Sequence, residues 1–203
     1  MKSKFSHFKL SLRVHFFLIK GLLVTLGVLL NSCSEKIYQK EDYSFYNKTF
    51  KIDPSSLLRT DGIYILSSIW TNENGGVVKQ TNDHCFYKFY STGQCNLTLD
   101  PELKIKTDQD YVKAVEKDFL ALQHTLFQGY YKLSDEKIII QSRVLPRKQF
   151  EYKYGYVKKD SLIIVKAATH RKGTFDAVNY TDYYKEYYVF KSLPIDRTSE
   201  PQW

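Results

Sequence analysis

The sequence predicts a mainly β domain in which an antiparallel up-and-down meander closes into a small barrel with one helix. Three observations support this prediction. Short runs rich in Ile, Val, Tyr and Phe recur from residue 62 onwards and are separated by turn residues, as in antiparallel strands. Residues 91–93, Ser-Thr-Gly, are a strong signal for a short hairpin between two such runs. One segment, residues 108–126, has the period of a helix instead.

Eight or nine short segments have the composition of strands. The first, residues 62–70, ends at the turn sequence Asn-Glu-Asn-Gly-Gly of residues 72–76. The others are residues 77–80, 85–90, 94–99, 130–133, 137–144, 150–157, 162–168 and 185–191. Closing such a meander removes the exposed edges that promote aggregation, so we expect a barrel.

The predicted helix depends on an apolar stripe at spacings of three and four. Its members are Tyr111, Val115, Phe119, Leu122 and Leu126. We expect the helix to cover one face or end of the sheet and its stripe to be core, not a cofactor site.

Four short sequences in this order resemble the lipocalin-like domains of Bacteroidetes lipoproteins. They are Asp-Gly-Ile-Tyr at residues 61–64, Phe-Tyr-Ser-Thr-Gly at 89–93, Gly-Tyr-Tyr-Lys-Leu at 129–133 and Asp-Ser-Leu-Ile-Ile at 160–164. The resemblance implies a lipocalin-like barrel, which we assign to residues 57–193. Residues 33–56 are expected to be a tether with some residues that pack on the domain, and residues 194–203 a polar tail.

The N-terminus has the pattern of an export signal. Residues 1–20 carry five basic and no acidic residues, and an apolar run of ten residues follows, too short to span a bilayer. Leu30-Asn31-Ser32-Cys33 then resembles the lipobox of bacterial lipoproteins. The resemblance implies cleavage of signal peptide 1–32 after Ser32 and attachment of acyl chains such as palmitate at Cys33. Several acyl chains on one residue are sufficient for stable anchoring.

Cleavage would change the charge of the protein. Five of the 30 Lys and Arg residues and none of the 22 Asp and Glu residues lie in the signal, so the net charge would fall from +8 to +3. The basic character belongs largely to the signal, and we expect no nucleic-acid partner.

Cys85 and Cys95 are the cysteines that follow Cys33. A hairpin turning at residues 91–93 places Cys95 opposite Phe89 or Tyr90, which leaves Cys85 roughly 13–17 Å away along the strand. A disulfide needs Cα atoms within about 7 Å. The spacing therefore favours two buried, reduced thiols over a disulfide.

The common signatures of catalysis are absent from the sequence. There is no Gly-x-Ser-x-Gly, P-loop or dinucleotide fingerprint, and His84, His124 and His170 do not stand at metal-ligand spacings. We expect neither an enzyme nor a metal or other cofactor.

Tyrosine is abundant, with 17 residues. Tyr152, Tyr154 and Tyr156 share one face of a predicted strand. They and Trp70, at the end of the first strand, are the candidate ligand-binding residues, forming an aromatic wall for an amphipathic ligand. The alternative is that tyrosine simply covers a half-buried strand surface.

We therefore expect a lipid-anchored, non-enzymatic binding module of the cell envelope, held at the outer membrane and binding a hydrophobic or amphipathic small molecule. Either face of that membrane is consistent with the sequence. The alternative is a structural or assembly subunit that docks a partner protein through a tyrosine-rich face.

Overall fold

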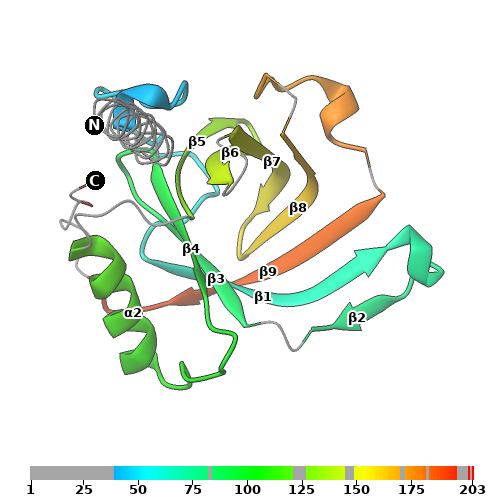
Figure 1. Cartoon of the computed structure of the whole chain (residues 1–203), viewed down its shortest axis with the longest axis horizontal. Coiled ribbons are helices and arrows are strands. Elements are labelled where there is room, and N and C mark those ends of the chain that lie inside the picture. The colour runs from blue at the N-terminus through cyan, green and yellow to red at the C-terminus, as the bar shows by residue number, and fades with distance from the viewer. Residues whose placement is uncertain are drawn as a thin grey trace, which may run out of the picture. The chain divides into compact units, whose positions relative to one another are not determined.

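Nine antiparallel strands form a continuous sheet, and eight of them close into a barrel (Figure 1). The computed structural model describes residues 39–81, 84–120, 127–144, 149–169, 172–181 and 183–195, with Pro201 and Trp203. The strands are β1 (Gly62–Thr71), β2 (Val78–Gln80), β3 (Cys85–Phe89), β4 (Gln94–Leu99), β5 (Gln128–Ser134), β6 (Lys137–Val144), β7 (Gln149–Lys158), β8 (Ser161–Ala168) and β9 (Tyr184–Ser192). The helix is α2 (Asp108–Leu120), and three 3-10 turns are η1 (Lys40–Asp42), η2 (Asn72–Asn74) and η3 (Ala177–Asn179).

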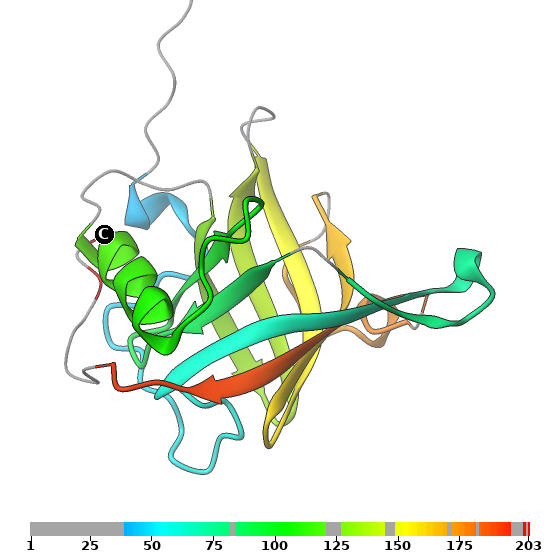
Figure 2. The ribbon, with the colours of Figure 1, turned by 90° about the horizontal axis from the view of Figure 1, so that it is seen from below.

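Pairing between the first and last strands closes the barrel. The β1–β9 ladder runs from Gly62 opposite Ser192 to Thr71 opposite Tyr184. β2 lies outside the closed barrel and pairs with the far half of β1, so this hairpin reaches out from the barrel in Figure 2. The predicted fold class, an antiparallel barrel with one helix, is confirmed.

The hairpin at residues 91–93 has the predicted geometry. Phe89 pairs with Cys95, and the N–H of Tyr90 donates to the carbonyl of Gln94 at 2.9 Å. Gly93 has φ +86°, a left-handed conformation that glycine adopts without steric cost. The position of a single glycine therefore sets this register.

Aromatic side chains fill the interior of the barrel. Because successive strand residues point to opposite faces, alternate residues of each strand face inward. The inner cluster includes Tyr64, Tyr87, Phe89, Tyr131 and Tyr188, each buried. The ring centroids of Phe89 and Tyr131 are 5.3 Å apart, and those of Tyr87 and Tyr188 are 5.2 Å apart. Edge-to-face contacts of this kind add to the stabilisation from apolar burial.

A second cluster covers the outer face of β5 to β8. Its buried members are Tyr43, Phe45, Tyr130, Ile139, Tyr154, Val165 and Tyr180. Tyr43 and Phe45 come from residues 39–58, here called the strap, which crosses this face before entering β1. The N–H of Phe45 donates to the Gln141 side chain on β6 at 2.9 Å. The strap is therefore part of the folded domain.

Residues 39–56 are the described part of the predicted tether, in which some residues are expected to pack on the domain. Further along the strap, Phe50 and Ile52 pack against the inner cluster. The described part of the predicted tether thus belongs to the domain, because its aromatic side chains cover strand faces that water would otherwise reach.

The described end of the predicted polar tail, residues 194–203, contacts the barrel. Pro201 is buried, and Trp203 packs against the outer cluster with its ring centroid 6.0 Å from that of Tyr130. The Gln94 side-chain amide donates to the Trp203 carbonyl at 2.5 Å. An apolar terminal residue thus docks on the barrel.

Helix α2 packs on a third cluster, as its apolar stripe predicted. Tyr111 and Val115 are buried against Ile63, Phe86 and Leu193. Leu122 and Leu126, and the side chain of Phe119, lie outside what the structure describes. The helix begins where Thr107 and Asp110 exchange side-chain-to-backbone hydrogen bonds of 2.9 and 3.3 Å, as in a capping box.

The predicted signal peptide, with Ser32 and Cys33, lies outside the described residues. None of the helices in the described ranges combines the length and the apolar run needed to cross a membrane.

Candidate binding site

A cavity opens in the barrel wall where β8 and β9 separate. Their ladder ends at Ile164 opposite Glu186, just before a bulge at Val165 in β8. Within the described residues, no further pairing joins the remainder of β8 to the start of β9. The cavity, of about 570 Å³, is lined by Glu151, Lys153, Val165, Lys166, Ala167, Thr181, Tyr183, Tyr184 and Glu186. We call it the lateral cavity.

Lys153 of β7 places a buried positive charge in this wall. Only 16% of its side chain is exposed, and its Nζ lies 4.0 Å from Glu151 Oε2 and 5.7 Å from the ring centroid of Tyr87. Glu151 and Lys153 are two residues apart on one strand, so both face inward. The cavity therefore borders an ion pair held by strand geometry.

Glu186 of β9 is fixed by two tyrosines on the same strand face. The hydroxyl of Tyr184 donates to Glu186 Oε1 at 2.5 Å, and that of Tyr188 donates to Oε2 at 2.7 Å. Hydrogen bonds to an ionised acceptor are stronger than neutral ones. Glu186 is thus oriented before any ligand arrives.

The protonation states of this cluster are set by burial and by its carboxylates. Burial raises the pKa of Tyr188 far above its ordinary value, and Tyr87 and Glu186 add to the shift. Burial also raises the pKa of Tyr184, with a further contribution from its hydrogen bond to Glu186. Both phenols therefore stay protonated at neutral pH and can donate to the carboxylate.

Lys153 stays charged. Burial alone would lower its pKa, but Tyr87, Glu186 and Glu151 together raise the pKa above its ordinary value. An ammonium held in this state is a poor nucleophile but a strong hydrogen-bond donor. The arrangement suits recognition by charge and hydrogen bonding.

The structure places the predicted ligand-binding tyrosines elsewhere. Tyr152, Tyr154 and Tyr156 do share one strand face, but it is the outer face, opposite to that of Lys153. Tyr154 is fully buried, with its ring centroid 5.8 Å from that of Tyr180. The chain itself covers this face, so these tyrosines do not form a wall around the barrel interior.

Tyr152 and Tyr156 have structural partners as well. The Gln141 side-chain amide donates to the Tyr152 hydroxyl at 3.1 Å, and the ring centroids of Tyr156 and Tyr180 are 5.4 Å apart. The alternative reading of the tyrosines, that they cover a strand surface, fits these contacts.

Trp70 is not brought together with those tyrosines. Its Nε1 donates to the Gly76 carbonyl at 2.6 Å, inside the β1–β2 connection, and Lys185 Nζ lies 5.3 Å from its ring centroid. These contacts stabilise the projecting hairpin.

Sequence reasoning missed Glu151, Lys153 and Glu186. The sequence does contain a signal for these residues. Glu151 and Lys153 alternate with the candidate ligand-binding tyrosines along one strand, and Glu186 lies between Tyr184 and Tyr188. Charged residues at every second position of a buried strand indicate a polar site. Which face points inward was not visible in the sequence.

His84 has a structural role. Its Nδ1 lies 2.8 Å from Asp100 Oδ2 and its Nε2 lies 2.8 Å from the Tyr111 hydroxyl, which links β3, the β4–α2 loop and helix α2. His124 and His170 lie outside the described residues. Among the residues that are described, no group of three or more His, Cys, Asp or Glu side chains could hold a metal ion.

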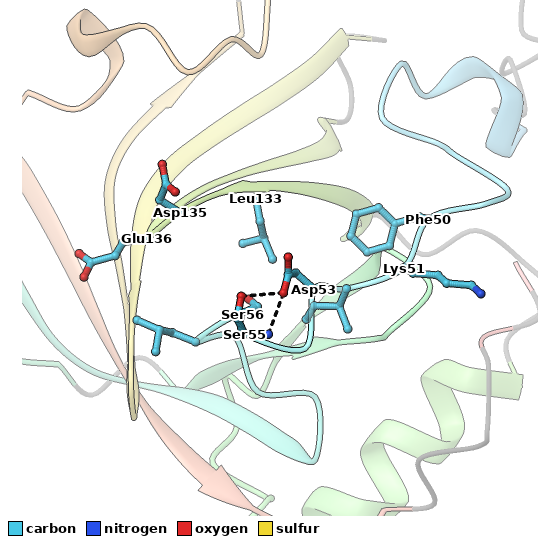
Figure 3. Close-up of a pocket in the computed structure, with 10 residues that line it drawn as sticks. Phe50, Lys51, Asp53, Ser55, Ser56, Leu133, Asp135 and Glu136 are labelled. Atoms are coloured by element: carbon cyan, nitrogen blue, oxygen red, sulfur yellow. Dashed lines mark hydrogen bonds between the residues drawn. The ribbon is translucent and has the colours of Figure 1, made fainter.

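A second cavity, of about 450 Å³, lies where the strap passes the β5–β6 turn (Figure 3). Leu133 points into it, and Asp53 Oδ1 accepts from the Ser55 N–H at 2.8 Å and the Ser55 hydroxyl at 2.6 Å. These bonds hold a turn of the strap and lower the pKa of Asp53. The Asp53 carboxylate therefore serves the local turn of the strap.

Neither Cys85 nor Cys95 forms a disulfide, and both thiols are buried, as predicted. Cys95 pairs with Phe89, and Cys85 lies four residues up the same strand, opposite Leu99. Burial raises the pKa of the Cys95 thiol. The thiols are therefore unreactive parts of the core.

Comparison of the chain with protein-family models, with curated proteins and with solved structures finds no match in any of the three.

Proposed function

We propose that this chain is a lipid-anchored, non-enzymatic binding module of the cell envelope, and that its lateral cavity binds a small amphipathic molecule. The observation that carries the proposal is a cavity of about 570 Å³ bordered by the largely buried, charged Lys153. Binding sites for small molecules fall within roughly 300–1,000 Å³ and combine apolar walls with a few placed polar groups.

The packed interior directs the ligand to this cavity. Tyr64, Phe89 and Tyr131 occupy the centre of the barrel and are fully buried. At the cavity, Ala167 and Tyr183 are both exposed and offer apolar surface beside the charged Lys153. This combination favours an amphipathic ligand over a wholly apolar one.

The anchor is supported by the lipobox-like residues Leu30 to Cys33. The first described residue, Gln39, follows Cys33 by six positions, so the covalent chain between lipid and domain spans at most about 20 Å. Cell fractionation and the intact mass of the native protein, beside a Cys33→Ala variant, test the anchor. We expect the wild type to be acylated and to appear in the membrane fraction, and the Cys33→Ala variant to be neither acylated nor membrane-bound. A wild type without acylation would refute the anchor.

Ligand binding is tested by native mass spectrometry of the full-length protein after incubation with total lipid extract. We expect wild type to retain a ligand and Lys153→Met to lose it. Lys113→Met, which alters an exposed lysine on α2, is the matched control. Retention that is equal in wild type and Lys153→Met would place the ligand elsewhere.

An assembly subunit is the second candidate function, and the filled barrel interior favours it. The tyrosine face on β7 is covered, so a partner would contact exposed apolar residues such as Val178 and Tyr183. Crosslinking from Tyr183 in intact cells would then capture one partner in stoichiometric amount.

A further inference from the structure

We infer that the ligand of the lateral cavity is an amphiphile with a zwitterionic head group, an inference that rests on the function proposed above. Three observations support it: the charges that line the cavity, the charged groups there that can still bond to a ligand, and the apolar surface beside them.

The charges that the described residues place along the cavity are balanced. Its described lining includes two carboxylates, Glu151 and Glu186, and two ammonium groups, Lys153 and Lys166. A ligand with a net negative charge would place that charge beside the carboxylates, and a ligand with a net positive charge would place it beside the ammonium groups, in a partly desolvated site. Like charges in such a site are unfavourable, because the local dielectric is below that of water. A head group without net charge is therefore favoured.

Glu186 and Lys166 are held in place by hydrogen bonds from or to the protein itself. Glu186 accepts from Tyr184 and Tyr188, one hydroxyl on each oxygen. Lys166 Nζ donates to the Val178 carbonyl at 2.8 Å. These contacts place Glu186 and Lys166 in supporting roles.

Lys153 has a side-chain hydrogen bond with Tyr87, which leaves two of its three ammonium donors, so Lys153 and Glu151 can still meet a ligand. Their charged atoms are 4.0 Å apart, which is longer than a hydrogen bond, and 25% of the Glu151 side chain is exposed. Lys153 can donate to an anionic oxygen, and Glu151 can accept from a neighbouring ammonium. A head group that carries both charges close together satisfies both residues at once.

The apolar part of the ligand has a surface to contact. Val165 and Ala167 line the cavity on β8, and the Tyr183 ring is 71% exposed at its rim. A volume of about 570 Å³ holds a head group and the start of an alkyl chain, with the remaining chain lying over the rim.

Three probes with the same acyl chain test the inference: lysophosphatidylethanolamine (zwitterionic), lysophosphatidic acid (anionic) and monoacylglycerol (uncharged). Each competes for full-length protein in a non-ionic ether detergent, and native mass spectrometry measures occupancy. We expect the zwitterionic probe to exceed both others at least about tenfold, which two charge-assisted hydrogen bonds readily supply.

The Glu151→Gln variant sharpens the test. It removes one negative charge from a partly exposed position, so the variant should fold, and its preference should shift to lysophosphatidic acid. Glu116→Gln, an exposed position on α2, should keep the wild-type order. Equal occupancy by the three probes, or a wild-type preference for the anionic or uncharged one, would overturn the zwitterionic head group while leaving amphiphile binding intact. Retention of none of them would count against the proposed function as well.

Discussion

The ring of Phe50 lies against Gly93, so that a Cβ on the glycine would come 2.9 Å from Phe50 Cγ. Gly93 also has φ +86°, where other residues are strained. We expect Gly93→Ala to lower the free energy of unfolding by about 2–4 kcal/mol, because backbone strain and overpacking act together. Urea denaturation of the two proteins measures the difference.

Gly75 offers a matched control. It has φ +69°, but a Cβ there would meet nothing within 4 Å. Gly75→Ala should therefore lower the free energy of unfolding only through backbone strain, by about 1–2 kcal/mol. If the two variants lose equal stability, the strap does not pack on the β3–β4 hairpin as described.

Removing the Tyr188 hydroxyl tests the bonding of Glu186. We expect Tyr188→Phe to destabilise the protein by about 1.5–3 kcal/mol, since a partly buried carboxylate loses a charge-assisted hydrogen-bond donor. Tyr184→Phe should cost less, because that residue is more exposed. In a Glu186→Gln background the effect of Tyr188→Phe should shrink; an unchanged effect would mean that the hydroxyl acts through packing alone.

Acid should weaken the attachment of helix α2 through Asp100. Burial opposes its charge, but hydrogen bonds from the Ile105 and Lys104 N–H groups and from His84 lower the pKa of Asp100 in the folded protein. A lowered folded pKa stabilises the protein above the unfolded value of about 3.9, and this contribution is lost as pH falls through the folded pKa.

Urea midpoints measured from pH 6 to pH 2.5 test this effect. Asp100→Asn should be less stable at pH 6 and should lose less stability below pH 4 than the wild type. Glu116→Gln should follow the wild type throughout. Parallel curves for Asp100→Asn and wild type would exclude Asp100 as a source of the acid sensitivity.

The two core thiols should be inert in the native protein. Cys85 and Cys95 are 8% and 1% exposed, and burial raises the pKa of Cys95. We expect no maleimide labelling of either residue until the protein is unfolded, and then labelling of both without a reductant. Peptide mapping identifies the sites, and a crosslinked Cys85–Cys95 peptide would contradict the register of the hairpin.

Much of the architecture followed from the sequence, because its signals are local. The nine strands lie within a few residues of their predicted bounds, and Gly93 and the residues around it predicted both the hairpin and the separation of Cys85 from Cys95. Tyr111 and Val115 predicted the buried face of α2. Turn chemistry and side-chain period operate over a few residues, so the order of amino acids is sufficient to reveal them.

The candidate site was decided by tertiary structure. The period of two put Tyr152, Tyr154 and Tyr156 on one face and Lys153 on the other, but it did not say which face points into the barrel. Closure of β1 on β9 and the packing of the strap's Tyr43 and Phe45 against the outer face made that choice. Inward and outward faces differ only in what distant parts of the chain cover, and such long-range packing has no local signature in the sequence.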